Sequence, residues 1–256
     1  MNRIFFIISI LLLSCGLYAQ ELVQEDTTLK QTPEAHIFAT FVKSFDHGLS
    51  LTIEEEIRSA PSHRAHTTLG LGYAPLPYLN IYAAYTVMLY GTQGWDDPKK
   101  FLRHRANVLV TGQVKLGGWN LSLREGVMMD ARMDEVDRRE KNAVDLTLRS
   151  RLQAVYSIPN TPLGIVGKME ILNTLNAPTA YLNEVSSDKK YGEYINELRP
   201  EAGLQWKINK QNSLTLTYRF NYLYSRNINV LDNKDVELTH AYTHKHLILL
   251  AYKFGW

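Results

Sequence analysis

The sequence has 256 residues, of which 45% are hydrophobic, 21% charged and 11% aromatic, with a formal net charge of +2. This composition fits one domain of ordinary size and excludes a disordered or collagen-like chain. The near-neutral charge gives no electrostatic basis for binding nucleic acid, whereas the 15 tyrosines favour a protein with aromatic side chains at a membrane–water boundary.

The first residues are typical of a secretory signal peptide. Arg3 supplies a positive charge, and the apolar stretch from Ile4 to Leu13 is too short to span a bilayer, which requires about 20 apolar residues. Cleavage after Ala19 would remove residues 1–19. A lipobox-like segment around Cys15, the only cysteine, offers acylation as an alternative. We expect ordinary cleavage, because Leu13 fits a lipobox poorly.

Residues 20–34 are predicted to form a polar N-terminal segment. Glu21, Glu25, Asp26 and Lys30 suit a polar tail better than a lipid-facing strand. This segment is expected either to contribute one extra strand or to thread the lumen as a plug.

Apolar and polar residues then alternate through most of the chain, as in β-strands with two different faces. The clearest case is 213–225, where Leu214, Leu216, Tyr218 and Phe220 share one face. The predicted strands are 36–45, 49–58, 64–75, 78–90, 101–116, 119–130, 144–156, 163–173, 194–208, 213–225 and 248–256. Most are longer than the ~5–6 residues of ordinary strands and reach the ~9–11 residues that a tilted membrane strand needs.

The predicted connections alternate between short and long, which is typical of transmembrane barrels with short periplasmic turns and long extracellular loops. Short turns are predicted at 46–48, 76–77, 117–118, 157–162 and 209–212, and longer links at 59–63, 91–100, 131–142, 174–193 and 226–243. Residues 35–256 therefore predict an all-β, antiparallel transmembrane barrel. Because single-chain bacterial barrels have an even number of strands, we expect twelve, with ten as the alternative.

The face opposite the apolar one carries charges that would point into the lumen, since a lipid-facing Arg or Lys costs about 2–4 kcal/mol at the bilayer midplane. The predicted lumen-facing residues are Glu54, Glu56, Arg58, Arg103, Arg105, Lys115, Arg124, Asp145, Arg149, Arg151, Lys168, Glu170, Glu197, Arg199, Glu201, Lys207, Arg219 and Lys253. They form either a ladder of paired charges that fills a narrow lumen, which we favour, or a water-filled passage with a weak preference for anions. Glu55 and Glu125 fall on the lipid-facing side, at a bulge or near the rim.

No motif predicts catalysis, a metal site or a cofactor. His63 with His66, and His244 with His246, are close pairs but supply too few ligands for zinc, and we expect them to be solvated. His104 and Ser150 would both lie on the outward face, so an outer-rim lipase or protease is the alternative function, although no motif supports such a dyad.

Several segments resemble a family of Gram-negative outer-membrane barrels whose function is unknown. They include LSLTIEEEIR at 49–58, RHRANVLVTGQVKLGGWNLSLREG at 103–126, LRSRLQAVYSIPNTPL at 148–163 and HLILLAYKFGW at 246–256. The alternating Tyr252, Phe254 and Trp256 are similar to the C-terminal signal that the barrel-assembly machinery recognises. The resemblance implies an outer-membrane barrel and implies no activity.

These observations predict an exported, integral outer-membrane β-barrel that acts as a narrow pore or as a structural surface protein. Besides the outer-rim enzyme, a soluble periplasmic β protein is an alternative. The expected partners are outer-membrane lipid and lipopolysaccharide, with the barrel-assembly machinery during biogenesis. Neither a solute nor an oligomeric state follows from the sequence.

Overall fold

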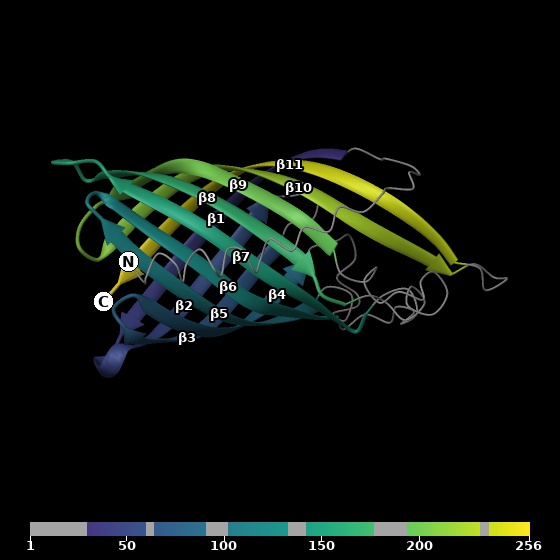
Figure 1. Cartoon of the computed structure of the whole chain (residues 1–256), viewed down its shortest axis with the longest axis horizontal. Helices are drawn as coiled ribbons and strands as arrows, with labels where there is room; N and C mark the ends of the chain where they lie inside the picture. Colours follow the sequence, from purple (N-terminus) through teal and green to yellow (C-terminus); the bar gives the residue numbers. More distant parts are fainter. Residues whose placement is uncertain (1–29, 60–63, 91–101, 133–141, 177–193, 231–235) are drawn as a thin grey trace.

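The chain forms a closed β-barrel of eleven strands (Figure 1). This computed structural model describes residues 30–59, 64–90, 102–132, 142–176, 194–230 and 236–256. The strands are β1 (Lys30–Ser44), β2 (Leu49–Ser59), β3 (Arg64–Leu76), β4 (Leu79–Tyr90), β5 (Leu102–Leu116), β6 (Trp119–Arg132), β7 (Val144–Ser157), β8 (Leu163–Thr174), β9 (Tyr194–Lys207), β10 (Asn212–Val230) and β11 (Val236–Gly255). Each strand overlaps one of the eleven predicted strands, so the prediction of an all-β barrel is confirmed.

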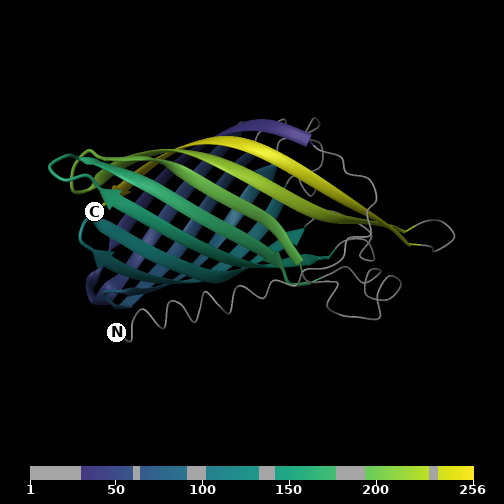
Figure 2. The ribbon, with the colours of Figure 1, turned by 45° about the horizontal axis from the view of Figure 1, so that its top comes forward.

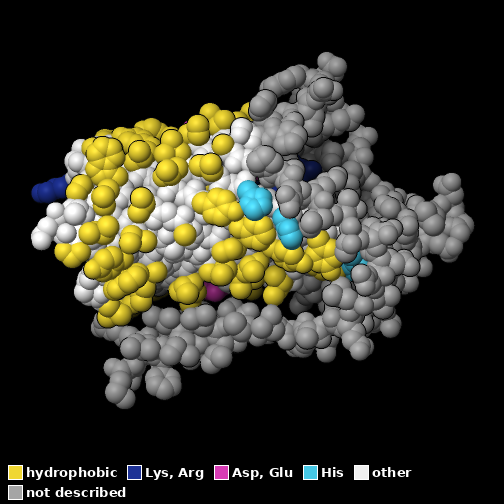
Figure 3. Space-filling model, turned by 90° about the horizontal axis from the view of Figure 1, so that it is seen from above, with side chains coloured by type: hydrophobic (Ala, Val, Ile, Leu, Met, Phe, Trp, Pro, Cys, Tyr) yellow, Lys and Arg dark blue, Asp and Glu magenta, His cyan; other side chains and the backbone are white. Residues whose placement is uncertain are grey.

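The alternation places apolar side chains on the outside of the barrel. Leu216, Tyr218 and Ile248 lie on the outward face of β10 and β11 and are 50 to 59% exposed. Figure 3 shows hydrophobic side chains spread over an outer face that carries few charged ones. No segment of the described chain forms a helix long and apolar enough to cross a bilayer.

The barrel closes through one parallel pair. Every other pair of neighbouring strands is antiparallel, but β1 lies parallel to β11, with Lys30 opposite Thr243 and Val42 opposite Gly255. Both predicted strand numbers, twelve and ten, are therefore wrong. An even number is required only when all pairs are antiparallel, and the parallel pair allows eleven strands to form a closed ring.

The short connections lie together at one end of the barrel (Figure 2). Between β1 and β2, a 3-10 turn at Asp46–Gly48 reverses the chain, with His47 and Gly48 at φ of 58° and 76°. A Cβ atom on Gly48 would lie 2.4 Å from the carbonyl oxygen of Ala74, so this tight approach requires glycine. In the β5–β6 turn Gly117 has a φ of 58°, and here the backbone conformation alone favours glycine.

Two predicted boundaries are corrected. β1 begins at Lys30, so part of the predicted polar segment 20–34 is a strand; the rest of it and the signal peptide at 1–19 lie outside the described residues. The link predicted at 226–243 is mostly strand, because β10 continues to Val230 and β11 begins at Val236. Most of the other long links lie outside the described residues.

The inward face combines charged groups with packed apolar ones. Met88 on β4 and Leu247 on β11 are fully buried. Gly70 makes room for a ring, since a Cβ atom there would lie 2.0 Å from the Tyr82 hydroxyl. Gly72 lies at a similarly crowded point of the inward face, because a Cβ atom there would lie 2.4 Å from the Ser50 hydroxyl.

Candidate functional site in the barrel lumen

The strand registers place all the predicted lumen charges on the inward face of the barrel. Glu56 pairs with buried His66, Arg105 with Asp130, and Glu170 with Arg199. Lys115, Lys207 and Lys253 lie on the same face near the short turns and are exposed there. The remaining predicted charges line the middle and the far half of the lumen.

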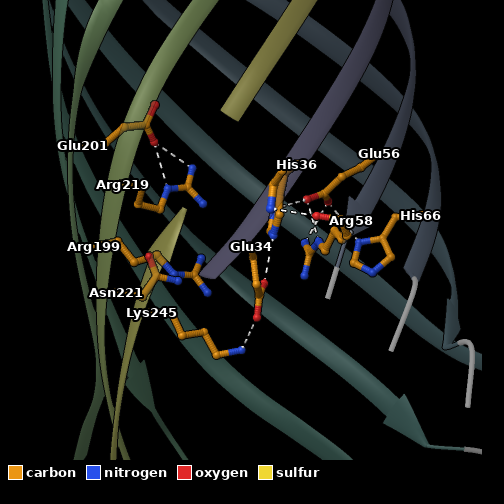
Figure 4. Close-up of polar contacts among 12 residues, drawn as sticks. Glu34, His36, Glu56, Arg58, His66, Arg199, Glu201, Arg219, Asn221 and Lys245 are labelled. Atoms are coloured by element: carbon orange, nitrogen blue, oxygen red, sulfur yellow. Dashed lines mark hydrogen bonds and ion pairs between the residues drawn. The ribbon is translucent and has the colours of Figure 1, made fainter. Parts of the chain in front are cut away.

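One group of ion pairs spans the seam where the barrel closes. This seam cluster consists of Glu34, His36, Glu56, Arg58, His66 and Lys245 (Figure 4). The Lys245 Nζ atom lies 2.8 Å from Glu34 Oε1, which joins β11 to β1. His36 has one ring nitrogen 3.0 Å from Glu34 and the other 3.0 Å from Glu56, which joins β1 to β2. Charge contacts therefore support the hydrogen bonds of the parallel pair.

A second group of ion pairs crosses β7 to β10. This wall network consists of Arg149, Lys168, Glu170, Glu197, Arg199, Glu201 and Arg219. Glu170 accepts hydrogen bonds from Arg149 at 2.7 Å and from Arg199 at 3.0 Å. Glu201 lies between Lys168, at 2.5 Å, and Arg219, at 2.7 Å. Each of these two carboxylates thus serves two bases on neighbouring strands.

The acids of both groups lie deeper than their lysine and arginine partners. Side-chain exposure runs from 2% for Glu201 to 9% for Glu56, but from 17% for Arg219 to 25% for Lys245 among the Lys and Arg partners. His36 and His66, at 4%, are as buried as the acids. The carboxylates are held against the barrel wall and the guanidinium and ammonium groups cover them. The surface that a solute in the lumen would meet is therefore mainly basic.

Two inward-facing arginines depart from this pairing. Arg124 on β6 stands directly opposite Arg151 on β7, and neither forms an ion pair with any residue that the structure describes. Arg124 Nε donates a hydrogen bond to Thr111 Oγ1 at 3.2 Å, which fixes the guanidinium. Like charges directly opposite on neighbouring strands are destabilising. Arg149, two positions before Arg151 on the same face, adds a third guanidinium nearby.

Glu54 faces these arginines from the opposite wall. Its carboxylate accepts a hydrogen bond from Thr40 at 3.0 Å and interacts electrostatically with Arg124 and Arg149. β2 and β7 are five strands apart in the closed ring of eleven, which is the largest separation possible. Charged side chains from opposite walls of the barrel therefore lie within electrostatic range of one another at this level.

Sequence reasoning missed five members of these contacts, namely Glu34, His36, His66, Asp130 and Lys245. Asp130 ends the predicted strand 119–130 and is absent from the predicted lumen charges, yet Arg105 donates to both of its carboxylate oxygens, at 2.5 and 2.7 Å. Following the alternation to the end of the predicted strand 119–130 would have found Asp130, and extending it before residue 36 would have found Glu34. The solvated interpretation of the histidine pairs was wrong for His66, which is buried; His63 lies outside the described residues.

The structure does not bring His104 and Ser150 together on the outward face. Tyr85 makes a short hydrogen bond with His104 Nδ1, while Ser150 donates to Glu125 at 2.6 Å. The strand β6 lies between them: His104 on β5 is opposite Ala131 of β6, whereas Ser150 on β7 is opposite Glu125 of β6, six residues away. Glu55 also pairs outward, with Thr67 at 2.9 Å, and neither glutamate lies at a register shift. Among the described residues no group of three potential ligands is placed to hold a metal ion.

The predicted C-terminal aromatic residues lie at the end of the barrel with the short turns. Tyr252 donates a hydrogen bond to Asn212, and the rings of Phe254 and Trp256 stack at 5.3 Å. Lys43 lies 5.6 Å from the centre of the Trp256 ring. Nothing in these contacts tests recognition by the assembly machinery, which stays a prediction.

Comparison with known proteins gives one family and a structural likeness. A model of the family described as "Protein of unknown function (DUF2490)" matches residues 37–232. No curated protein matches the sequence. A structure described as "NanC porin structure in rhombohedral crystal form" is 10% identical, with a TM-score of 0.46, over 84% of this chain and 90% of that one.

Proposed function

The chain belongs to the DUF2490 family, whose description assigns no activity, and we propose that it is an integral outer-membrane β-barrel that forms a narrow, arginine-lined pore. One observation carries this proposal: the outward face of the barrel is apolar and exposed while the inward face is charged. Ile57, Leu71 and Ile248 are 59 to 64% exposed, which is unfavourable in water over so continuous a surface.

The dimensions support a position across a membrane. The shortest strand, β2, has 11 residues and the longest, β11, has 20, against the ~9–11 that a tilted strand needs. Aromatic rings gather at both ends of the outward face, as expected at the two interfaces of a bilayer. They include Phe41, Trp119, Tyr156 and Trp206 near the short turns and Tyr222, Tyr224 and Tyr242 toward the other end. By this orientation the short turns are periplasmic and the long links extracellular.

The charge arrangement supports a preference for anions. Because the buried carboxylates are covered by guanidinium and ammonium groups, an anion entering the lumen would meet a basic surface, whereas a cation would meet like charge. Charged side chains from opposite walls, with Glu54 facing the arginines, would limit passage to small solutes.

Single-channel conductance in a planar bilayer tests the proposal. Detergent-purified protein that is folded, as judged by heat-modifiable migration, is expected to give a steady, anion-selective conductance. Silence from folded protein would exclude the pore and leave a closed, structural surface barrel. The fully buried inward side chains of Met88 and Leu247 favour that second candidate.

A further inference from the structure

The facing arginines Arg124 and Arg151 are the feature of the lumen that the ion-pair groups leave unexplained. The carboxylates of the seam cluster and of the wall network lie against basic partners from neighbouring strands. Arg124 and Arg151 are paired in register with each other. Arg151 also lies opposite Glu170 on β8, but that carboxylate is held by Arg149 and Arg199, and neither Arg124 nor Arg151 forms an ion pair or a hydrogen bond with a carboxylate among the described residues. The cost of facing like charges at a site otherwise rich in paired ones points to a ligand of opposite charge.

We propose that Arg124, Arg149 and Arg151 form an oxyanion-binding site inside the lumen, specific for a small carboxylate or phosphate group. The proposal rests on the proposed pore function, whose solute class it names. Planar guanidinium groups bind such oxygens through two parallel hydrogen bonds, and guanidinium is the side-chain group best suited to this recognition.

The local contacts leave the donors of this site available. Arg124 uses its Nε atom on Thr111, and its two terminal nitrogens make no hydrogen bond to a described residue. Arg149 uses Nε on Glu170. Arg151 donates to no described residue at all. An oxyanion between the three would therefore replace no existing contact of Arg124 or Arg151.

The site lies about halfway along the lumen, where a solute that crosses the barrel would pass it. Arg124 is five residues beyond the start of β6 at Trp119, which places it about 13 Å from the short turns, roughly midway through a ~25 Å apolar band. Glu54 on the opposite wall would repel the same anion, so that binding is reversible and the solute can leave.

Inorganic phosphate is the probe, and its binding to folded protein in detergent is measured by calorimetry at constant ionic strength. The wild-type protein is expected to bind phosphate saturably. Arg124→Gln and Arg151→Gln should each weaken binding about tenfold or more, the loss of charge-assisted hydrogen bonds. Glu54→Gln should strengthen it, because the repelling carboxylate is removed.

Arg219→Gln is the matched control, because it removes the same charge from the same lumen at an arginine already paired with Glu201. It should leave phosphate affinity within about twofold. Equal losses in all three arginine variants would mean a diffuse positive potential and would overturn the site, as would the absence of binding to the wild type. If a Gln variant does not fold, Arg124→Lys and Arg151→Lys keep the charge and should still weaken binding.

A conductance measurement distinguishes failure of the proposed binding site from failure of the proposed pore. A conducting wild-type protein that does not bind phosphate would overturn the site and keep the pore. A silent protein in which Arg124→Gln and Arg151→Gln abolish phosphate binding would keep the site and overturn the pore.

Discussion

At the scale of single residues, the lumen depends on carboxylates that are buried but well paired. Removing a charge from its water costs several kcal/mol, and only good geometry with additional hydrogen bonds offsets this cost. Glu170 meets the requirement through Arg149 and Arg199, which approach different oxygens of the same carboxylate. The acid is therefore more critical than either base, because without it two guanidinium groups lose their counter-charge together.

Replacing Glu170 with Gln is expected to lower the free energy of unfolding by about 3 kcal/mol or more, since the change leaves Arg149 and Arg199 uncompensated. Urea unfolding in detergent or liposomes measures the loss. Lys115→Gln, an exposed inward lysine near a short turn, is the control and should change stability by less than about 0.5 kcal/mol. Equal stability of the two variants would argue that the wall network contributes nothing.

At the scale of elements, the strands could be predicted because each barrel strand has one apolar face outside and one polar face inside. The two faces appear in the sequence as alternating apolar and polar residues. The alternation of Leu216 and Tyr218 with Thr217 and Arg219 persists wherever one side is apolar and the other charged. The alternation of apolar and polar residues is lost at strand ends that extend past the apolar band. There His240 and His244 lie on the outward face of β11 beside aromatic rings, and polar residues on both faces resemble a loop.

The cost of replacing an outward-facing leucine with arginine should depend on how deep the leucine lies in the apolar band. Leu216→Arg lies four residues from the start of β10, well inside the apolar band, and is expected to cost about 2–4 kcal/mol. Leu116→Arg, at the end of β5 beside Gly117, should cost about 0–1 kcal/mol, because arginine near the interface reaches water. Heat-modifiable migration after refolding into liposomes compares the two. A soluble barrel would tolerate both changes equally.

At the scale of the whole molecule, the closure could not be predicted from strand patterns. The even-number rule assumes that all neighbours are antiparallel, and only the register of β1 with β11 shows that one pair is not. The site depends on register in the same way. Arg124 and Arg151 are 27 positions apart in the sequence, and their facing positions follow from the way β6 pairs with β7. The sequence therefore predicts which residues face the lumen but not which of them meet.

Parallel closure predicts a specific cross-link. Ile37 and Leu250 lie opposite each other on the outward faces of β1 and β11, so the double variant Ile37→Cys with Leu250→Cys should form a disulfide in the folded barrel. Phe41→Cys with Leu250→Cys shifts the pair by four residues, about 13 Å, and should stay reduced.

The only native cysteine, Cys15, lies in the predicted signal peptide, so a linked peptide containing positions 37 and 250 identifies the bond by mass spectrometry. A twelfth strand between β1 and β11 would hold the two positions about 10 Å apart and prevent the bond. The Glu34–Lys245 and His36–Glu56 contacts join strands at the same seam. The register of β1 with β11 therefore also positions charged groups of the lumen, where the proposed pore and oxyanion site lie. Absence of the Ile37–Leu250 disulfide in folded protein would overturn the eleven-stranded ring.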